Sequence, residues 1–97
     1  MPVVRYTSRA ESDLDEIADY TRHTWNELQV NKYLDEMEHF CVLLAQNPRL
    51  GRTYSKVHPA WRRMEHKSHV ILYREIETGI LVQRILHKSM LPQRQGF

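Results

Sequence analysis

The chain has 97 residues and a formal net charge of +2, and this length predicts a single domain, residues 1–97, with one core of its own. Its one cysteine, Cys41, cannot form an intramolecular disulfide, and no apolar run approaches the roughly 20 residues of a membrane span. The N-terminal stretch also lacks the apolar segment of a signal peptide. These features exclude a disulfide-rich secreted protein and an integral membrane protein, and they predict a cytoplasmic location.

The charges divide unevenly along the chain. Residues 1–50 contain five Lys and Arg against nine Asp and Glu, whereas residues 51–97 contain nine against three. The division predicts an acidic layer and a basic layer, and a basic layer suits nucleic acid or an acidic protein partner. Two solvated faces of opposite sign that bind nothing explain the division equally well.

A strand is predicted over residues 2–7, where β-branched residues precede Ser8. A helix is predicted over 8–25, because Ser8 and Glu11 have the spacing of a capping box. Apolar residues recur along it at helical spacing and predict an inward face. Its carboxylates predict a solvated face: Asp13, Asp15, Glu16 and Asp19.

A second helix is predicted over residues 27–46 from a broad apolar stripe that includes Cys41. Thr24 and Glu27 have the spacing of another capping box, and the Asn47-Pro48 pair ends the helix. The short link forces the two helices to run antiparallel as a hairpin. Cys41 is therefore expected to be a buried packing residue.

After a basic loop that includes Arg52 and Lys56, the pattern changes to the period of strands. The middle strand is apolar at consecutive positions, Val70 to Leu72, which predicts that a loop or a partner covers its second face. The fold class expected is α+β, with an N-terminal strand and an antiparallel helical hairpin packed on a small antiparallel sheet. The last three strands are predicted at 60–66, 69–76 and 80–87, with turns at Lys67-Ser68 and Thr78-Gly79.

Most catalytic and metal-binding patterns are missing. The carboxylates of the first helix are stacked along that helix, whereas a glycosidase needs two carboxylates opposed across a cleft. The six histidines have neither the HExxH spacing nor the zinc-finger spacing, and His66 and His69 are expected to point to different sides of a turn. No glycine-rich phosphate loop occurs, so no metal and no cofactor are predicted.

Basic residues remain, on or beside the predicted sheet: Arg62, Arg63, Arg74, Arg84 and Lys88. Alternation along a strand places Arg62 and Arg63 on opposite faces. In the last strand, Arg84 is expected to share a face with Val82 and Leu86, and His87 to lie on the other. The stretch RILHKSML at 84–91 then favours a surface that binds a partner over a catalytic one, with Met90 and Leu91 as adaptable apolar contacts. Arginines that cover the sheet and pair with the acidic helix are the alternative.

Five pieces of the sequence resemble one known family. They are Ala10, Asp13-Leu14, Ile17 and Tyr20; then Trp25; then NPRLGR at 47–52, HVILYR at 69–74 and RILHKSM at 84–90. In this order and spacing they resemble the ParE toxins of the RelE/ParE superfamily over nearly the whole chain. The resemblance implies a helical hairpin on a small antiparallel sheet, in agreement with the pattern.

The resemblance also implies a function. ParE-branch toxins bind DNA gyrase, and a ParD-like antitoxin neutralises them; no sequence-specific binding of nucleic acid by the toxin alone is implied. The contact residues expected here are Arg62, Arg63, Arg74, Arg84, Lys88, Met90 and Leu91. We expect reversal of Arg84 and Lys88 to glutamate to weaken toxicity or antitoxin binding and to leave the fold intact.

The RelE branch shares the fold but cuts messenger RNA on the ribosome, which requires acid–base and cationic groups that converge on one phosphate. The tyrosine typical of that branch is missing after Arg84. If the chain is a nuclease, the candidates are Tyr73, Arg84 and His87. An inert module that keeps only its antitoxin contacts is a third alternative.

Overall fold

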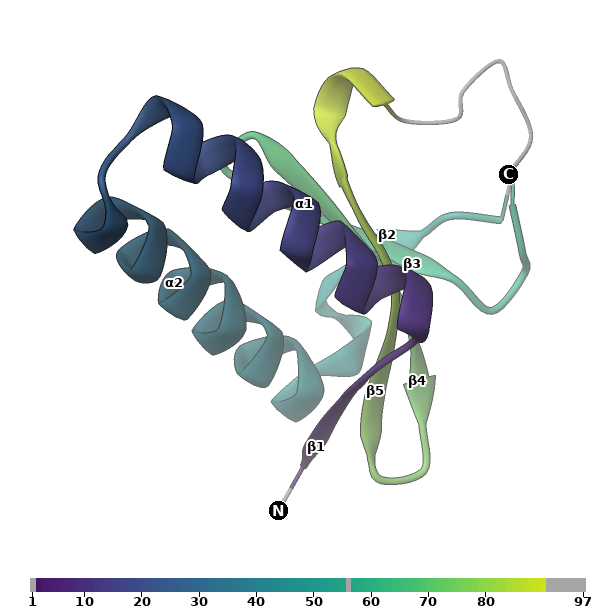
Figure 1. Ribbon diagram of the computed structural model, residues 1–97. Helices are drawn as coiled ribbons and strands as arrows, with labels where there is room; N and C mark the ends of the chain where they lie inside the picture. Colours follow the sequence, from purple (N-terminus) through teal and green to yellow (C-terminus); the bar gives the residue numbers. More distant parts are fainter. Residues whose placement is uncertain (1, 56, 91–97) are drawn as a thin grey trace.

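The computed structural model describes residues 2–55 and 57–90, and it has two layers: a helical hairpin that covers one face of a five-stranded sheet (Figure 1). This confirms the predicted α+β class. Among the described residues no helix is long and apolar enough to cross a membrane. The elements are β1 (Val3–Tyr6), α1 (Ser8–Thr24), α2 (Glu27–Gln46), the 3-10 turn η1 (Pro48–Leu50), β2 (Arg52–Thr53), β3 (Arg62–His66), β4 (His69–Ile76), β5 (Gly79–His87) and the 3-10 turn η2 (Lys88–Met90).

The strands follow the order β1-β5-β4-β3-β2, and of the described strands only β1 and β5 pair in parallel. Strand β2 was not predicted, because its two residues lie in a stretch with the composition of a loop. The turn before β5 consists of Glu77 and Thr78, and Gly79 is already its first strand residue. Gly79 has a φ of +153°, and a Cβ there would collide with the main chain of Val3. Glycine therefore permits the close approach of β1 to β5.

A bulge interrupts the pairing of β4 with β5. Leu72 lies opposite Arg84, but Tyr73 lies opposite Val82, so Gln83 is an extra residue on β5. Val82 consequently packs in the cluster beneath the helices, whereas Leu86 packs on the other face. The expectation that Arg84, Val82 and Leu86 share one face is wrong for this reason.

Both helix caps differ from the predicted ones. Thr7, not Ser8, caps α1: its Oγ1 accepts from the N–H of Ala10 at 3.0 Å and donates to the carbonyl of Gln83 at 2.9 Å. Asn26, not Thr24, caps α2 by accepting from the N–H of Gln29 at 2.9 Å. Thr7 has the additional bond to the sheet, which a sequence pattern does not reveal.

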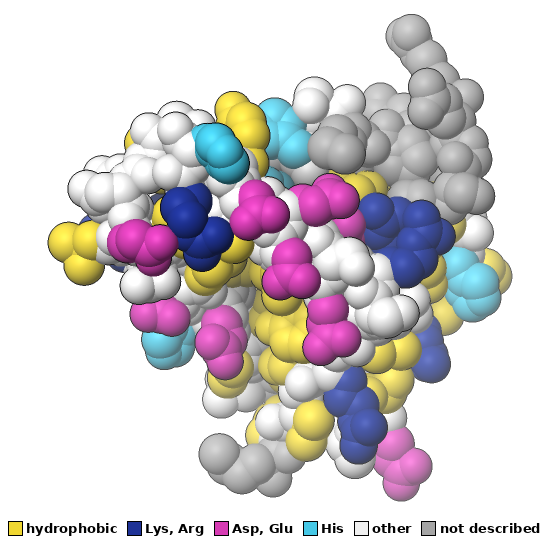
Figure 2. Space-filling view, viewed as in Figure 1, with side chains coloured by type: hydrophobic (Ala, Val, Ile, Leu, Met, Phe, Trp, Pro, Cys, Tyr) yellow, Lys and Arg dark blue, Asp and Glu magenta, His cyan; other side chains and the backbone are white. Residues whose placement is uncertain are grey.

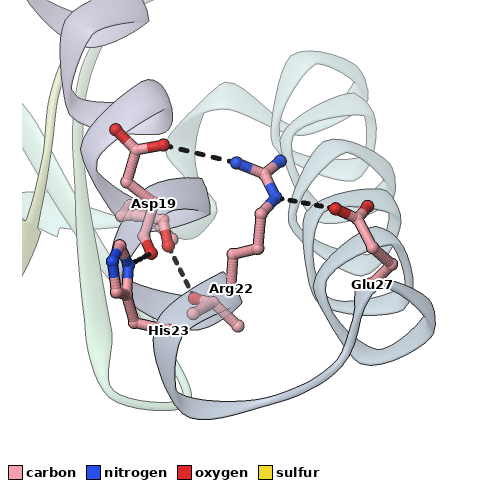
Figure 3. Close-up of polar contacts among 6 residues, drawn as sticks. Asp19, Arg22, His23 and Glu27 are labelled. Atoms are coloured by element: carbon pink, nitrogen blue, oxygen red, sulfur yellow. Dashed lines mark hydrogen bonds and ion pairs between the residues drawn. The ribbon is translucent and has the colours of Figure 1, made fainter.

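An exposed cluster joins the end of α1 to the start of α2 (Figure 3). The Arg22 guanidinium donates to Asp19 at 3.3 Å and to Glu27 at 2.9 Å. The side chains of Asp19 and Glu27 are largely exposed, and such pairs contribute less than about 1 kcal/mol each. The hairpin is held mainly by its buried face, where Met37, Cys41 and Leu44 pack on the sheet.

A second, smaller cluster covers the other face of the sheet. Val70 and Leu72 of β4 pack there against Tyr54, with Val57 and Trp61 at the margin. These last three residues belong to the connection between β2 and β3. A loop thus covers the second face of β4, which explains its consecutive apolar residues and confirms that expectation.

Candidate interaction site beside the last strand

Asp13 completes the edge of β5. Strand β1 pairs with β5 only as far as Val82, whereas β5 continues to His87. Beyond this point Oδ2 of Asp13 accepts from the main-chain N–H of Ile85 at 2.9 Å. The same carboxylate accepts from the Arg84 guanidinium at 2.8 and 3.0 Å. One side chain therefore satisfies a strand N–H and an arginine, and it anchors α1 to β5.

This contact corrects the predicted solvated carboxylate face, because Asp13 is only 6% exposed. The sequence contains a signal that Asp13 is buried. Asp13 lies at helical spacing between two buried residues, Ala10 and Ile17, so the inward face of α1 includes a carboxylate. An acid at such a position needs a buried cationic or N–H partner.

Arg84 is engaged in this contact and is largely withdrawn from solvent, with 16% of its side chain exposed. The hydrogen bond from Arg84 to Asp13 raises the pKa of the guanidinium. Reversal of Arg84 to glutamate would place two carboxylates against each other in a nearly buried site. This is contrary to the expectation that reversal at residue 84 leaves the fold intact.

A groove of about 600 Å³ lies beside this contact, between the C-terminal half of α1 and the ends of β4 and β5. Ile17 and Ile85 contribute to its lining, and so do two aromatic side chains with large exposed fractions, Tyr20 at 74% and Trp25 at 52%. Exposed aromatic residues along an apolar groove are typical of a surface that binds a partner. Figure 2 shows acidic side chains gathered over the helical layer on this side of the molecule.

Three polar rings, those of Tyr33, His69 and His87, line the groove opposite α1. The Tyr33 hydroxyl lies 2.6 Å from Nδ1 of His69, and the rings of His69 and His87 meet edge to face at 5.6 Å. Burial, followed by the charge of His87, lowers the pKa of His69 to about 4. His69 is therefore neutral near pH 7, and its Nδ1 shares a hydrogen bond with the Tyr33 hydroxyl.

His66 and His69 do not point to different sides, as was predicted. They form a directly opposed pair across the β3–β4 turn, and opposed residues share a face. Both rings accordingly contact Tyr33, with centroids at 6.1 and 5.6 Å. Even so, no three side chains of the described residues are placed to hold a metal ion.

The three nuclease candidates do not converge. Tyr73 is fully buried; its hydroxyl donates to the carbonyl of Pro48 at 2.7 Å and accepts from the N–H of Gly51 at 2.8 Å. Burial raises the pKa of Tyr73. Its cross-strand partner is Val82, five residues before His87, which is about 17 Å along a strand. The remaining candidate, Arg84, is bound to Asp13.

The other basic residues differ in whether their side chains have partners within the molecule. Arg62 donates to the carbonyl of Gly51 at 2.7 Å, whereas Arg63 lies over the Tyr54 ring at 5.3 Å and pairs with Glu65 at 2.9 Å. Arg74 is half-buried on β4, and Lys88 is exposed in η2. Neither of these two forms an ion pair with another described residue. Lys56, Leu91 and the side chain of Met90 lie outside the described part of the chain.

Comparisons with known proteins identify the family. The model of the ParE toxin of type II toxin–antitoxin systems, parDE, matches residues 4–92. This chain belongs to the ParE toxin family. Toxin ParE1 of Mycobacterium tuberculosis is 37% identical over 82 residues, 84% of each chain, and Toxin ParE1 of Caulobacter vibrioides is 31% identical over 90 residues, 93% of each. Toxin ParE of Escherichia coli is 36% identical over 86 residues, covering 87% of this chain and 82% of the relative.

A solved structure shows the same fold. A chain described as the chromosomal ParDE TA system from P. aeruginosa superposes with a TM-score of 0.73, over 90% of this chain and 96% of that one. The two are 21% identical in sequence. The match therefore supports the ParE fold, a helical hairpin on a small sheet.

Replacement of Asp13 by alanine is expected to lower the free energy of unfolding by about 3–5 kcal/mol, because it removes both hydrogen bonds to the nearly buried Arg84 and the acceptor of the Ile85 N–H. Asp15→Ala, which removes an exposed carboxylate from the same helix, is the control and should change stability by less than about 0.5 kcal/mol. In urea unfolding, Asp13→Ala and Arg84→Met should show a coupling of about 1–3 kcal/mol. Additive effects of the two changes would contradict the assigned contact.

The stability of the fold should fall with acid because of His69. An unfolded histidine binds a proton near pH 6.5, but folded His69 does so only near pH 4. Its contribution is therefore complete above pH 6.5 and is lost as the pH falls towards 4. His69→Asn keeps a hydrogen-bonding partner for Tyr33 but does not titrate, so urea unfolding should show a weaker loss of stability in this range. His39→Asn, at an exposed site on α2, should follow the parent protein; equal pH profiles for both variants would refute the role of His69.

Proposed function

We propose that this ParE-family toxin inhibits DNA gyrase by binding to it, and that a ParD-like antitoxin neutralises it. Family membership supports the toxin role and an antitoxin partner. The inhibition of a topoisomerase goes beyond family membership and is the specific part of the proposal. It is supported by the kind of surface that the chain presents beside β5.

The single observation that carries the proposal is the separation of Tyr73, Arg84 and His87. Cleavage of RNA requires a base, an acid and cations around one phosphate. Here Tyr73 is buried and bound to Pro48 and Gly51, and Arg84 is bound to Asp13. His87 is exposed, but its Nδ1 is 2.8 Å from Oγ of Ser89. This arrangement supports action by binding rather than by catalysis.

Lys88 is the leading candidate for contact with the target. It is exposed in η2, directly after β5, and the segment that follows it contains the predicted contacts Met90 and Leu91. Arg74 is a second candidate from β4. By contrast, Arg62, Arg63 and Arg84 have intramolecular partners, so we assign them to the support of the fold. A cation at an exposed rim mainly increases the rate of association with an acidic surface.

The direct test uses purified gyrase, ATP and relaxed plasmid. Addition of this protein should abolish supercoiling and accumulate cleaved DNA, and the cognate antitoxin should restore activity. Unaffected gyrase, together with cleavage of messenger RNA in a translation extract, would reject the proposal in favour of the ribosome-dependent nuclease. An inert module would bind its antitoxin and affect neither system.

Substitutions can separate binding from catalysis in the same assay. Lys88→Glu should weaken gyrase inhibition by about fivefold to tenfold, the equivalent of about 1 kcal/mol. Arg5→Glu is the matched charge reversal, because Arg5 is exposed on β1 opposite Leu81, far from η2, and it should inhibit like the parent.

Tyr73→Phe removes two buried hydrogen bonds and should lower the free energy of unfolding by about 1–3 kcal/mol. At temperatures where this variant stays folded it should retain full inhibition of gyrase. Loss of toxicity in folded Tyr73→Phe would favour a catalytic role for the hydroxyl and count against the proposal.

A further inference from the structure

The turn between β3 and β4 belongs to a cluster of basic side chains. His66 of β3 is directly opposed to His69 of β4, and His69 is directly opposed to His87 of β5. Directly opposed residues share one face of a sheet. Lys67 stands in the turn between the first two histidines. Three histidines and a lysine are therefore gathered at one end of the sheet.

Helix α2 holds this turn through side chains of one face, namely Tyr33, Glu36 and Phe40. Tyr33 contacts both histidines of the turn, as described above. Glu36 accepts from the Lys67 ammonium at 2.7 Å, and the ring of Phe40 stacks on His66 with a centroid distance of 4.9 Å. The turn and α2 thus meet through polar rings and an ion pair, and two of the groups involved are histidines that acid can charge.

His66 contains a buried nitrogen that opposes protonation. Its Nε2 is buried and has no hydrogen-bond partner among the described residues. A protonated imidazole has two N–H donors, and a buried donor without an acceptor costs free energy. The Phe40 ring that stacks on His66 supplies no acceptor oxygen. Movement of the turn away from α2 would let water reach Nε2 and remove this cost.

Repulsion between the basic groups acts in the same direction. Burial, followed by the charges of His87 and His66, lowers the pKa of His69. Burial, followed by the charge of Lys67, also lowers the pKa of His66, and the opposing effect of Glu36 is smaller. Each proton that the cluster takes up therefore makes the next one less favourable while the turn stays against α2.

The acidic groups around the cluster are engaged with other cations or lie across the groove. Glu36 is the ion-pair partner of Lys67. Asp13 and Glu16 line the groove from α1, but Asp13 is bound to Arg84, which also interacts with Glu16. No carboxylate of the described residues forms an ion pair with any of the three histidines. Positive charge on the histidines is thus not compensated within the closed arrangement.

We infer that the β3–β4 turn is an acid-sensitive latch on the groove: protonation of His66 and His69 releases the turn from α2 and leaves the rest of the fold intact. Tyr33, Ser68 and His69 belong to the lining of the groove, so release of the turn widens it. The latch does not depend on the identity of the target of the toxin. It also goes beyond the loss of overall stability predicted above, because the release is local.

The local character of the release follows from where the core lies. The main buried cluster includes Ile71 and Tyr73 of β4, but neither histidine of the turn belongs to it. Helix α1 has its own attachment to the end of β5 through Asp13. Segments with few buried apolar contacts open at a lower free energy than the core does. The turn can therefore leave α2 while the central strands remain paired.

Relaxation dispersion of the backbone amides, measured on the unsubstituted protein at pH 7.5 and at pH 5, tests the inference. His69 has a pKa of about 4 against α2 and near 6.5 when released, so the equilibrium constant for release should rise about 30-fold as the pH falls. Exchange should appear at Lys67 and Ser68 and be absent from Leu72 in the middle of β4. Equal exchange of the turn and the central strand, or a turn without exchange at pH 5, would overturn the inference.

A double variant removes the titration without removing polar side chains from the turn. In His66→Gln combined with His69→Asn, the equilibrium constant for release should change by less than about twofold between the two pH values. His39→Asn removes an exposed histidine of α2 and should show the same rise as the parent protein. A rise in the double variant as large as that of the parent would refute the latch.

Discussion

The contact of Asp13 with Arg84 and the main chain of Ile85 determines how the two layers meet. Strand β1 is shorter than β5, so part of the edge of β5 has no neighbouring strand. A buried N–H without a partner costs about 1–3 kcal/mol, and Asp13 removes this cost for Ile85 from the first turns of α1. The same contact fixes α1 beside β5, and the groove lies between these two elements.

The division of charge along the sequence corresponds to the two layers. All nine acidic residues of the first half lie in α1 and α2. Among the described residues, two ion pairs join the layers: Arg84 with Asp13, and Lys67 with Glu36. The alternative that arginines of the sheet pair with the acidic helix is confirmed at Arg84. Much of the basic charge of the sheet therefore supports the fold, and Lys88 is left as an exposed cation at the end of β5.

Periodicity predicted the helical hairpin and the meander because apolar spacing depends on local geometry. The stripe of α2 and the consecutive apolar residues of β4 are examples of such patterns. The caps, the bulge and the shared face of His66 and His69 depend on tertiary contacts. Thr7 became a cap by also bonding Gln83, and the extra residue on β5 has no mark in the sequence. Alternation cannot locate Arg84 once a bulge resets it.

The candidate site could be predicted only in part from the sequence, because it too depends on tertiary contacts. Lys88 could be proposed from its position after the last strand, and the structure leaves it exposed. The groove could not be proposed, because its lining comes from α1, the β3–β4 turn and the end of β5. In the sequence, Tyr20 and Trp25 stand out only as parts of a resemblance to a family. Their large exposed fractions, 74% and 52%, indicate a binding surface because the structure places them along the groove.

The central claim is that this ParE toxin acts by binding its target and not by turning over a substrate. The most direct measurement is the number of gyrase molecules that each toxin molecule inactivates in a titration against purified gyrase. A binding inhibitor should give inhibition that saturates near equivalence and is reversed by the antitoxin. Unaffected gyrase, with many messenger RNA molecules cut per toxin molecule in a translation extract, would contradict the claim.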